Sequence, residues 1–150
     1  AALAVLRDTL QARGDAYWTQ VVDAQRQAVL AWIAHREGRT EEALRLASAA
    51  AEVEERAEKH PVTPGPILPA RELEGDLLLE LGRPADALRA YEATLAREPN
   101  RARALFGAAR AAELSGDRAA ARKRYQELTR VMRGTDRPEL RTARAFLARR

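Results

Sequence analysis

The sequence predicts an all-α protein built from helical hairpins. Apolar residues recur at helical spacing, and the chain lacks the long β-branched or aromatic runs that a β-hairpin needs. Hydrophobic residues make up 46% of the chain but aromatic residues only 5%. Alanine therefore supplies much of the apolar surface, and its small side chain lets helices pack close together. Glycine and proline stand where helices would end and begin.

A 34-residue repeat is the strongest regularity in the chain. The same glycine, alanine and tyrosine recur after 34 residues, first as Gly82, Ala87 and Tyr91 and then as Gly116, Ala121 and Tyr125. The glycine suits the position that ends the first helix of a hairpin, where the backbone adopts the left-handed conformation. The alanine lets the two helices cross closely, and the tyrosine fills the gap between adjacent hairpins. The repeat therefore predicts a stack of two-helix units.

This period resembles that of the tetratricopeptide repeat family. The family pattern is met in one unit by Gly75, Leu78, Gly82, Ala87, Tyr91 and Pro99, and in the next by Leu105, Ala109, Ala112, Gly116, Ala121 and Tyr125. Arg71 departs from it where the family often has tryptophan, and Arg133 where proline would fall. The resemblance implies a right-handed superhelix (solenoid) of antiparallel helix hairpins with about eight helices. The stretch 58–117 also resembles the C-terminal repeat region of large bacterial tetratricopeptide-repeat proteins of unassigned role.

The expected helices follow from these boundaries. They cover residues 2–13, 16–37, 40–59, 69–81, 84–97, 101–115, 118–132 and 137–149. Thr40 and Asp136 are the expected N-caps of two of them, because their side-chain oxygens can accept a hydrogen bond from the first turn. Gly38 precedes Gly82 by 44 residues rather than 34, and a proline-rich segment contains the surplus.

One domain, 1–150, is expected. Its parts are an orphan helix (1–14), a degenerate repeat (15–60), a proline-rich loop (61–68), two repeats (69–101 and 102–134) and a capping helix (135–150). The orphan helix and the missing initial methionine lead us to expect a natural protein that continues before Ala1. High arginine and alanine contents fit a bacterial source with GC-rich DNA.

No constellation of residues predicts catalysis, a metal or a cofactor. The chain has no cysteine, and its two histidines, His35 and His60, have no recognised ligand spacing. Ser48 and Ser115 lack the setting of a catalytic nucleophile. No glycine cluster suggests a phosphate-binding loop. We therefore expect no catalytic residues, no metal ligands, no cofactor and no enzymatic activity. No apolar run approaches the roughly 20 residues of a membrane span.

An acidic run within 41–58 is expected to be a solvated helix face. Two of its glutamates are expected to form i,i+4 pairs, Glu52 with Arg56 and Glu55 with Lys59.

The family resemblance implies a groove lined by the first helix of each hairpin, and hence a non-catalytic scaffold for a protein or peptide. The candidate ligand-binding residues are Trp32, His35, Arg36, Glu72, Asp76, Asn100, Arg103, Phe106 and Arg110. Arginines there would orient an acidic segment of the partner, with Trp32 and Phe106 as apolar anchors. The same two aromatic residues also fit a helix core, and the arginines also fit pairing with Asp76 or Glu72.

Two other functions stay open. From Arg101 onward the chain has 14 basic and 5 acidic residues, a net charge of +9, which suits an anion or nucleic acid. Nucleic acid is disfavoured because few aromatic residues are available there for base stacking. The first and last helices could instead support self-association, giving a homo-oligomer. The sequence leaves the compartment open between the cytoplasm and export, and it does not identify the partner.

Overall fold

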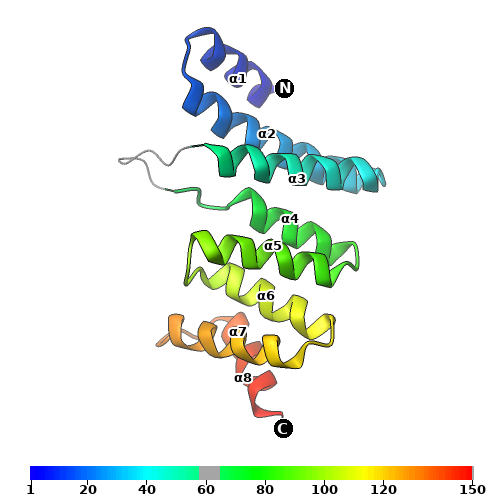
Figure 1. Cartoon of the computed structure of the whole chain (residues 1–150), viewed down its shortest axis with the longest axis vertical. Helices are drawn as coiled ribbons and strands as arrows, with labels where there is room; N and C mark the ends of the chain where they lie inside the picture. Colours follow the sequence, from blue (N-terminus) through cyan, green and yellow to red (C-terminus); the bar gives the residue numbers. More distant parts are fainter. Residues whose placement is uncertain (58–64, 150) are drawn as a thin grey trace. The chain divides into compact units, whose positions relative to one another are not determined.

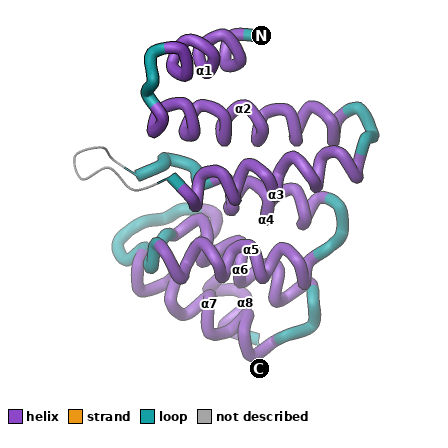
Figure 2. The backbone as a smooth tube through the Cα atoms, turned by 45° about the horizontal axis from the view of Figure 1, so that its top comes forward, coloured by secondary structure: helices purple, strands orange, loops and turns teal. Residues whose placement is uncertain are grey.

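A computed structural model describes residues 1–57 and 65–149. Within these residues the chain is entirely helix and loop, with eight α-helices (Figures 1 and 2). They are α1 (Ala2–Ala12), α2 (Ala16–Arg36), α3 (Thr40–Arg56), α4 (Ala70–Glu80), α5 (Pro84–Arg97), α6 (Ala102–Leu114), α7 (Arg118–Val131) and α8 (Pro138–Ala148). The all-α prediction is confirmed.

The helix boundaries agree with the prediction because glycine and proline mark them. Gly82 and Gly116 follow α4 and α6 with φ of +68° and +81°, the left-handed conformation in which glycine has no Cβ penalty. α3 is shorter than expected, because Ala57 is already extended at φ −65° and ψ 120°. The expected Glu55–Lys59 pair, His60 and part of the proline-rich loop involve residues 58–64, outside the described residues.

Two predicted N-caps are wrong by one residue. Thr40 is the first residue of α3 itself, so the cap position falls on Arg39, which makes no side-chain cap. Pro138 begins α8, so the cap position falls on Arg137 rather than Asp136. Proline favours the first helical position because its ring already holds the helical φ. The Asp136 carboxylate instead lies 3.3 Å from the Arg141 guanidinium.

The chain divides into two compact units, Ala1–Leu77 and Leu78–Arg150. In the first unit, α1 packs on α2 and α2 packs on α3. Both α2 and α3 bury mainly alanines, namely Ala24, Ala28, Ala31 and Ala34 of α2 and Ala43, Ala47, Ala50 and Ala51 of α3. Alanine lets the two backbones approach closely, which explains the low aromatic content of the chain. The single-domain organisation stays a prediction.

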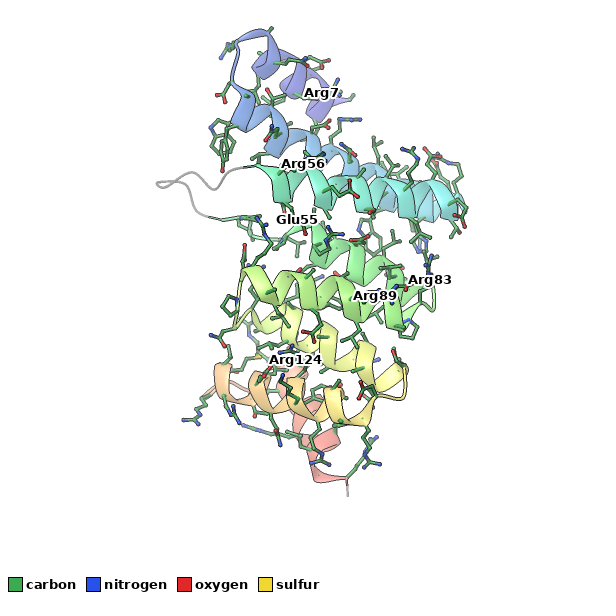
Figure 3. The ribbon with its side chains drawn as sticks, viewed as in Figure 1. Arg7, Glu55, Arg56, Arg83, Arg89 and Arg124 are labelled. Atoms are coloured by element: carbon green, nitrogen blue, oxygen red, sulfur yellow. The ribbon has the colours of Figure 1, made fainter. Side chains whose placement is uncertain are left out.

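The acidic run on α3 has a structural role at its C-terminal end. Glu54 Oε1 accepts a hydrogen bond of 2.8 Å from the backbone N–H of Ala70, at the start of α4. Glu55, labelled in Figure 3, receives two hydrogen bonds of 2.8 and 2.7 Å from the guanidinium of Arg71. Arg71 also bonds Glu74 at 2.7 Å. Thus the arginine that replaces the family's tryptophan joins α4 to α3 by charge.

In the second unit α5, α6, α7 and α8 pack in sequence order. The centre of α6 meets the Tyr91 ring of α5 at Gly107. Tyr125 of α7 lies between two phenylalanines, with ring centroids 6.4 Å from Phe106 of α6 and 4.9 Å from Phe146 of α8. Tyr91 therefore packs against α6, and Tyr125, one period later, packs against both α6 and α8.

Candidate binding surface

Helix α6 is buried on most of its circumference. Its buried residues are alanine and glycine except for one leucine, namely Ala104, Leu105, Gly107, Ala108, Ala109, Ala111 and Ala112. At 100° per residue, the side chains larger than alanine that are not buried form a single strip along the helix, which we call the α6 strip. It consists of Arg103, Phe106, Arg110, Glu113 and Leu114. Arg103 and Arg110 are exposed, Phe106 and Glu113 are half-buried, and Leu114 is 57% exposed.

Phe106 and Glu113 are held in place by Tyr125, the buried tyrosine of α7. Its hydroxyl donates a hydrogen bond of 2.9 Å to Glu113 Oε2, and its ring contacts that of Phe106. Burial, and then the hydrogen bond to Glu113, raises the pKa of the Tyr125 phenol well above its usual value. The tyrosine therefore keeps its proton and fixes both residues of the strip.

Two arginines, one just before α8 and one within it, recur one repeat period after those of α6. Arg137 and Arg144 follow Arg103 and Arg110 by 34 residues each, and both are exposed. Within the described part of the chain, neither they nor Arg110 have a carboxylate partner. α6 and α8 each pack against α7, so the second unit presents Arg110 and Arg144 within these two helices and Arg137 just before α8. Arg137 and Arg144 were not among the predicted site residues, although the 34-residue offset could have revealed them.

Other basic residues of the same region make contacts within the fold. The Arg124 guanidinium, labelled in Figure 3, bonds Glu92 of α5 through both Nε and Nη2, the first at 2.7 Å, and Glu127 at 2.6 Å. Arg118 and Arg122 both donate to the backbone oxygen of Arg149. Much of the positive charge of the C-terminal third therefore serves the fold.

The remaining predicted site residues have varied positions. Asn100 is exposed between α5 and α6 with φ of +67°. In the first unit, the rings of Trp32 and His35 meet edge to face, with centroids 5.9 Å apart, and Arg36 is exposed beside them. Asp76 is half-buried, whereas Glu72 is 0% exposed. Glu72 therefore does not present its carboxylate to a ligand at the surface.

No group of three or more histidine, cysteine, aspartate or glutamate side chains among the described residues could hold a metal ion. None of the described helices combines the length and apolar character needed to cross a membrane.

Residues 78–147 match the family model of the tetratricopeptide repeat. This stretch carries tetratricopeptide repeats. The match includes α8 as well as the hairpins before it. The crystal structure of PcrH from Pseudomonas aeruginosa is similar to 83% of this chain and 88% of that chain, with a TM-score of 0.62 and 17% sequence identity. At that identity the likeness shows the fold alone. Comparison with curated proteins gives no match.

Tetratricopeptide repeats typically act by binding rather than by catalysis, because stacked hairpins create extended surfaces for protein partners. A protein-interaction scaffold is therefore the general role that the family assignment supports.

Proposed function

We propose that the tetratricopeptide repeats of the second unit bind an acidic peptide segment of a partner protein on α6 and α8, without catalysis. The observation that carries this proposal is the arginine pattern. Arg110, Arg137 and Arg144 are exposed and have no carboxylate partner among the described residues. Guanidinium groups bind carboxylates by paired, charge-assisted hydrogen bonds, so aspartate and glutamate are the side chains that suit them.

The α6 strip adds an apolar contact to this charge. Leu114 is more than half exposed, and Phe106 keeps part of its ring accessible beside Arg110. Apolar anchors surrounded by polar groups are typical of peptide-binding surfaces. The preferred partner is therefore an acidic segment that contains a large apolar residue, rather than a purely acidic one.

Binding of labelled peptides by fluorescence anisotropy tests this proposal. One probe is an acidic peptide with a central leucine, and a second has glycine in place of that leucine. Arg110→Glu/Arg144→Glu should weaken binding of the first peptide at least tenfold, since charge-assisted contacts contribute about 1.5–3 kcal/mol each. The leucine-to-glycine change should weaken it further.

Lys123→Glu/Arg130→Glu is the matched control. It changes the net charge by the same amount through two exposed residues of α7. If both double variants lose affinity equally, the binding reflects net charge alone and the assignment to α6 and α8 is wrong. If single-stranded DNA binds more tightly than the leucine peptide, with affinity that falls steeply as salt rises, the nucleic-acid alternative replaces it.

A second candidate function, self-association, is favoured by the apolar surface of the first unit. α1 has no buried residue, and Val5 is 66% exposed. Val29 and Ile33 of α2 are also exposed. We infer that these side chains could join two copies of the chain. Light scattering tests this idea, because Val5→Ser/Ile33→Ser should convert a dimer to a monomer. A wild-type protein that is monomeric at high concentration would exclude it.

A further inference from the structure

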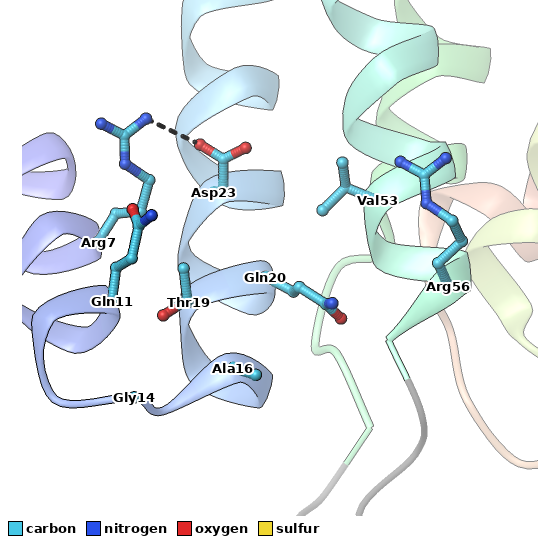
Figure 4. Close-up of a pocket in the computed structure, with 9 residues that line it drawn as sticks. All are labelled: Arg7, Gln11, Gly14, Ala16, Thr19, Gln20, Asp23, Val53 and Arg56. Atoms are coloured by element: carbon cyan, nitrogen blue, oxygen red, sulfur yellow. Dashed lines mark hydrogen bonds and ion pairs between the residues drawn. The ribbon is translucent and has the colours of Figure 1, made fainter.

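A pocket of about 540 Å³ lies in the first unit, over α2 and between α1 and the end of α3 (Figure 4). This volume is within the usual range for small-ligand sites. Polar side chains from all three helices line it, namely Arg7 and Gln11 of α1, Thr19, Gln20 and Asp23 of α2, and Arg56 of α3.

The guanidinium of Arg7 is held in a defined orientation at one side of the pocket. Its Nε donates to Asp8 Oδ1 at 2.8 Å, and its Nη1 donates to Asp23 Oδ1 at 3.4 Å. Asp23 is itself fixed by Arg26 at 2.9 Å and Gln27 at 2.6 Å. Because a guanidinium has five N–H groups, Arg7 keeps donors that these contacts do not use.

Arg56 stands at the other side of the pocket, at the end of α3 (Figure 4). The predicted pair of Arg56 with Glu52 is not formed, and Arg56 has no carboxylate partner among the described residues. Its charge is therefore uncompensated there. Gln20 extends from α2 toward the end of α3 in Figure 4, so the pocket also has an amide group on that side.

The charges that line the pocket indicate what it can hold. Arg7 and Arg56 contribute two positive charges and Asp23 one negative charge. The net charge of +1 suits a single carboxylate, whereas the second negative charge of a phosphate would be repelled by Asp23. We propose that this pocket binds a carboxylate group, with Arg56 as the main charge partner and Arg7, Gln11 and Gln20 as further hydrogen-bond donors.

The carboxylate could belong to a small organic acid, to the C-terminus of a peptide or to an acidic side chain, because all three present the same oxygens. This site is independent of the proposed peptide surface, since its residues all lie in the first unit and Arg110 and Arg144 lie in the second. Loss of either site by mutation leaves the residues of the other unchanged.

Backbone and side-chain amide shifts in ¹⁵N NMR spectra of the full chain test the proposal. The probes are succinate, a short neutral peptide with a free C-terminus, the same peptide amidated, an amidated form with one internal aspartate, and inorganic phosphate. At least one carboxylate probe should shift the side-chain amides of Gln11 and Gln20 in a saturable manner. The peptide forms then distinguish a terminal carboxylate from an acidic side chain.

Arg56→Gln should weaken that binding at least tenfold, since it removes the uncompensated charge. Arg45→Gln, an exposed arginine of the same helix outside the pocket, is the control and should bind as the wild type does. Circular dichroism checks that both variants fold. The proposal is overturned if no carboxylate probe shifts these amides, if Arg56→Gln binds as the wild type does, or if phosphate binds more tightly than every carboxylate.

Discussion

The ring of Tyr91 stands where a side chain at position 107 would begin. A Cβ built on Gly107 would lie 2.4 Å from both Cε1 and Cζ of the tyrosine. Real Cβ atoms do not approach other atoms so closely, so the contact between α5 and α6 depends on the absence of a side chain. A glycine inside a helix costs about 1 kcal/mol relative to alanine, and here the close approach of the tyrosine offsets that cost.

Gly107→Ala should therefore lower the free energy of unfolding of the second unit. Overpacking costs about 1–3 kcal/mol, and the higher helix propensity of alanine recovers part of that cost. Urea unfolding followed by circular dichroism measures the change. In a Tyr91→Leu background the same substitution should cost less, because the ring that it strikes is gone. An alanine variant as stable as the wild type would show that α5 and α6 separate freely at this point.

The Arg71–Glu55 pair should show measurable coupling. Both side chains are largely buried, and the two hydrogen bonds between them hold the geometry. A double-mutant cycle with Arg71→Met and Glu55→Gln should give about 1 kcal/mol of interaction free energy. The exposed Arg39–Glu42 pair is the control, and its cycle should give under about 0.5 kcal/mol. Equal values for both pairs would contradict a structural role for Arg71.

Stability should decrease in acid through Asp23. Burial alone would raise the pKa of this carboxyl group, but hydrogen bonds from Arg26 and Gln27 and the nearby charges outweigh burial and lower it. A lowered pKa in the folded state stabilises the fold above the unfolded pKa of about 4, and this contribution is lost as pH falls through the folded value. The melting temperature should therefore fall less between neutral and acid pH in Asp23→Asn than in the wild type. Glu41→Gln, an exposed control, should show the same pH dependence as the wild type.

Tyr125→Phe should cost about 1 kcal/mol, because the Glu113 carboxylate loses a hydrogen-bond donor. The raised pKa of Tyr125 has a second consequence at high pH. Its contribution to stability is complete below the unfolded value of about 10 and is lost as pH rises toward the folded value. Ultraviolet absorbance should show a tyrosine that ionises late in the wild type and is missing from the variant. Unchanged titration curves would contradict this assignment.

The helices could be predicted from the sequence because their ends are local. Gly82, Pro84 and Gly116 act through the backbone of their own residue, so a single sequence reveals them. The caps at Thr40 and Asp136 were misplaced because candidate polar residues stood next to the true boundary. Gly107 could also have been recognised, since an isolated glycine inside a helical pattern suggests that another element packs closely against the helix backbone there.

The binding residues were harder to predict because their exposure and contacts depend on residues that are distant in the sequence. The sequence placed Arg103, Phe106 and Arg110 on one helix face correctly, since that relation depends only on helical spacing. It did not show that Glu72 is buried, nor that Glu55 meets Arg71. The pocket was missed altogether, because Arg7 and Arg56 come from helices separated by α2.

The alanine-rich burial of α6 has a consequence for how its surface can change. Alanine and glycine have no rotamers, so only Leu105 among the buried residues of this helix can adjust its side chain. A ligand on the α6 strip therefore meets a helix whose own buried side chains can hardly rearrange, and the entropy lost on binding comes mainly from ordering the side chains of the strip. Recognition on this helix can be altered by exchanging Arg103 or Arg110 one at a time, because few buried side chains of α6 are able to respond.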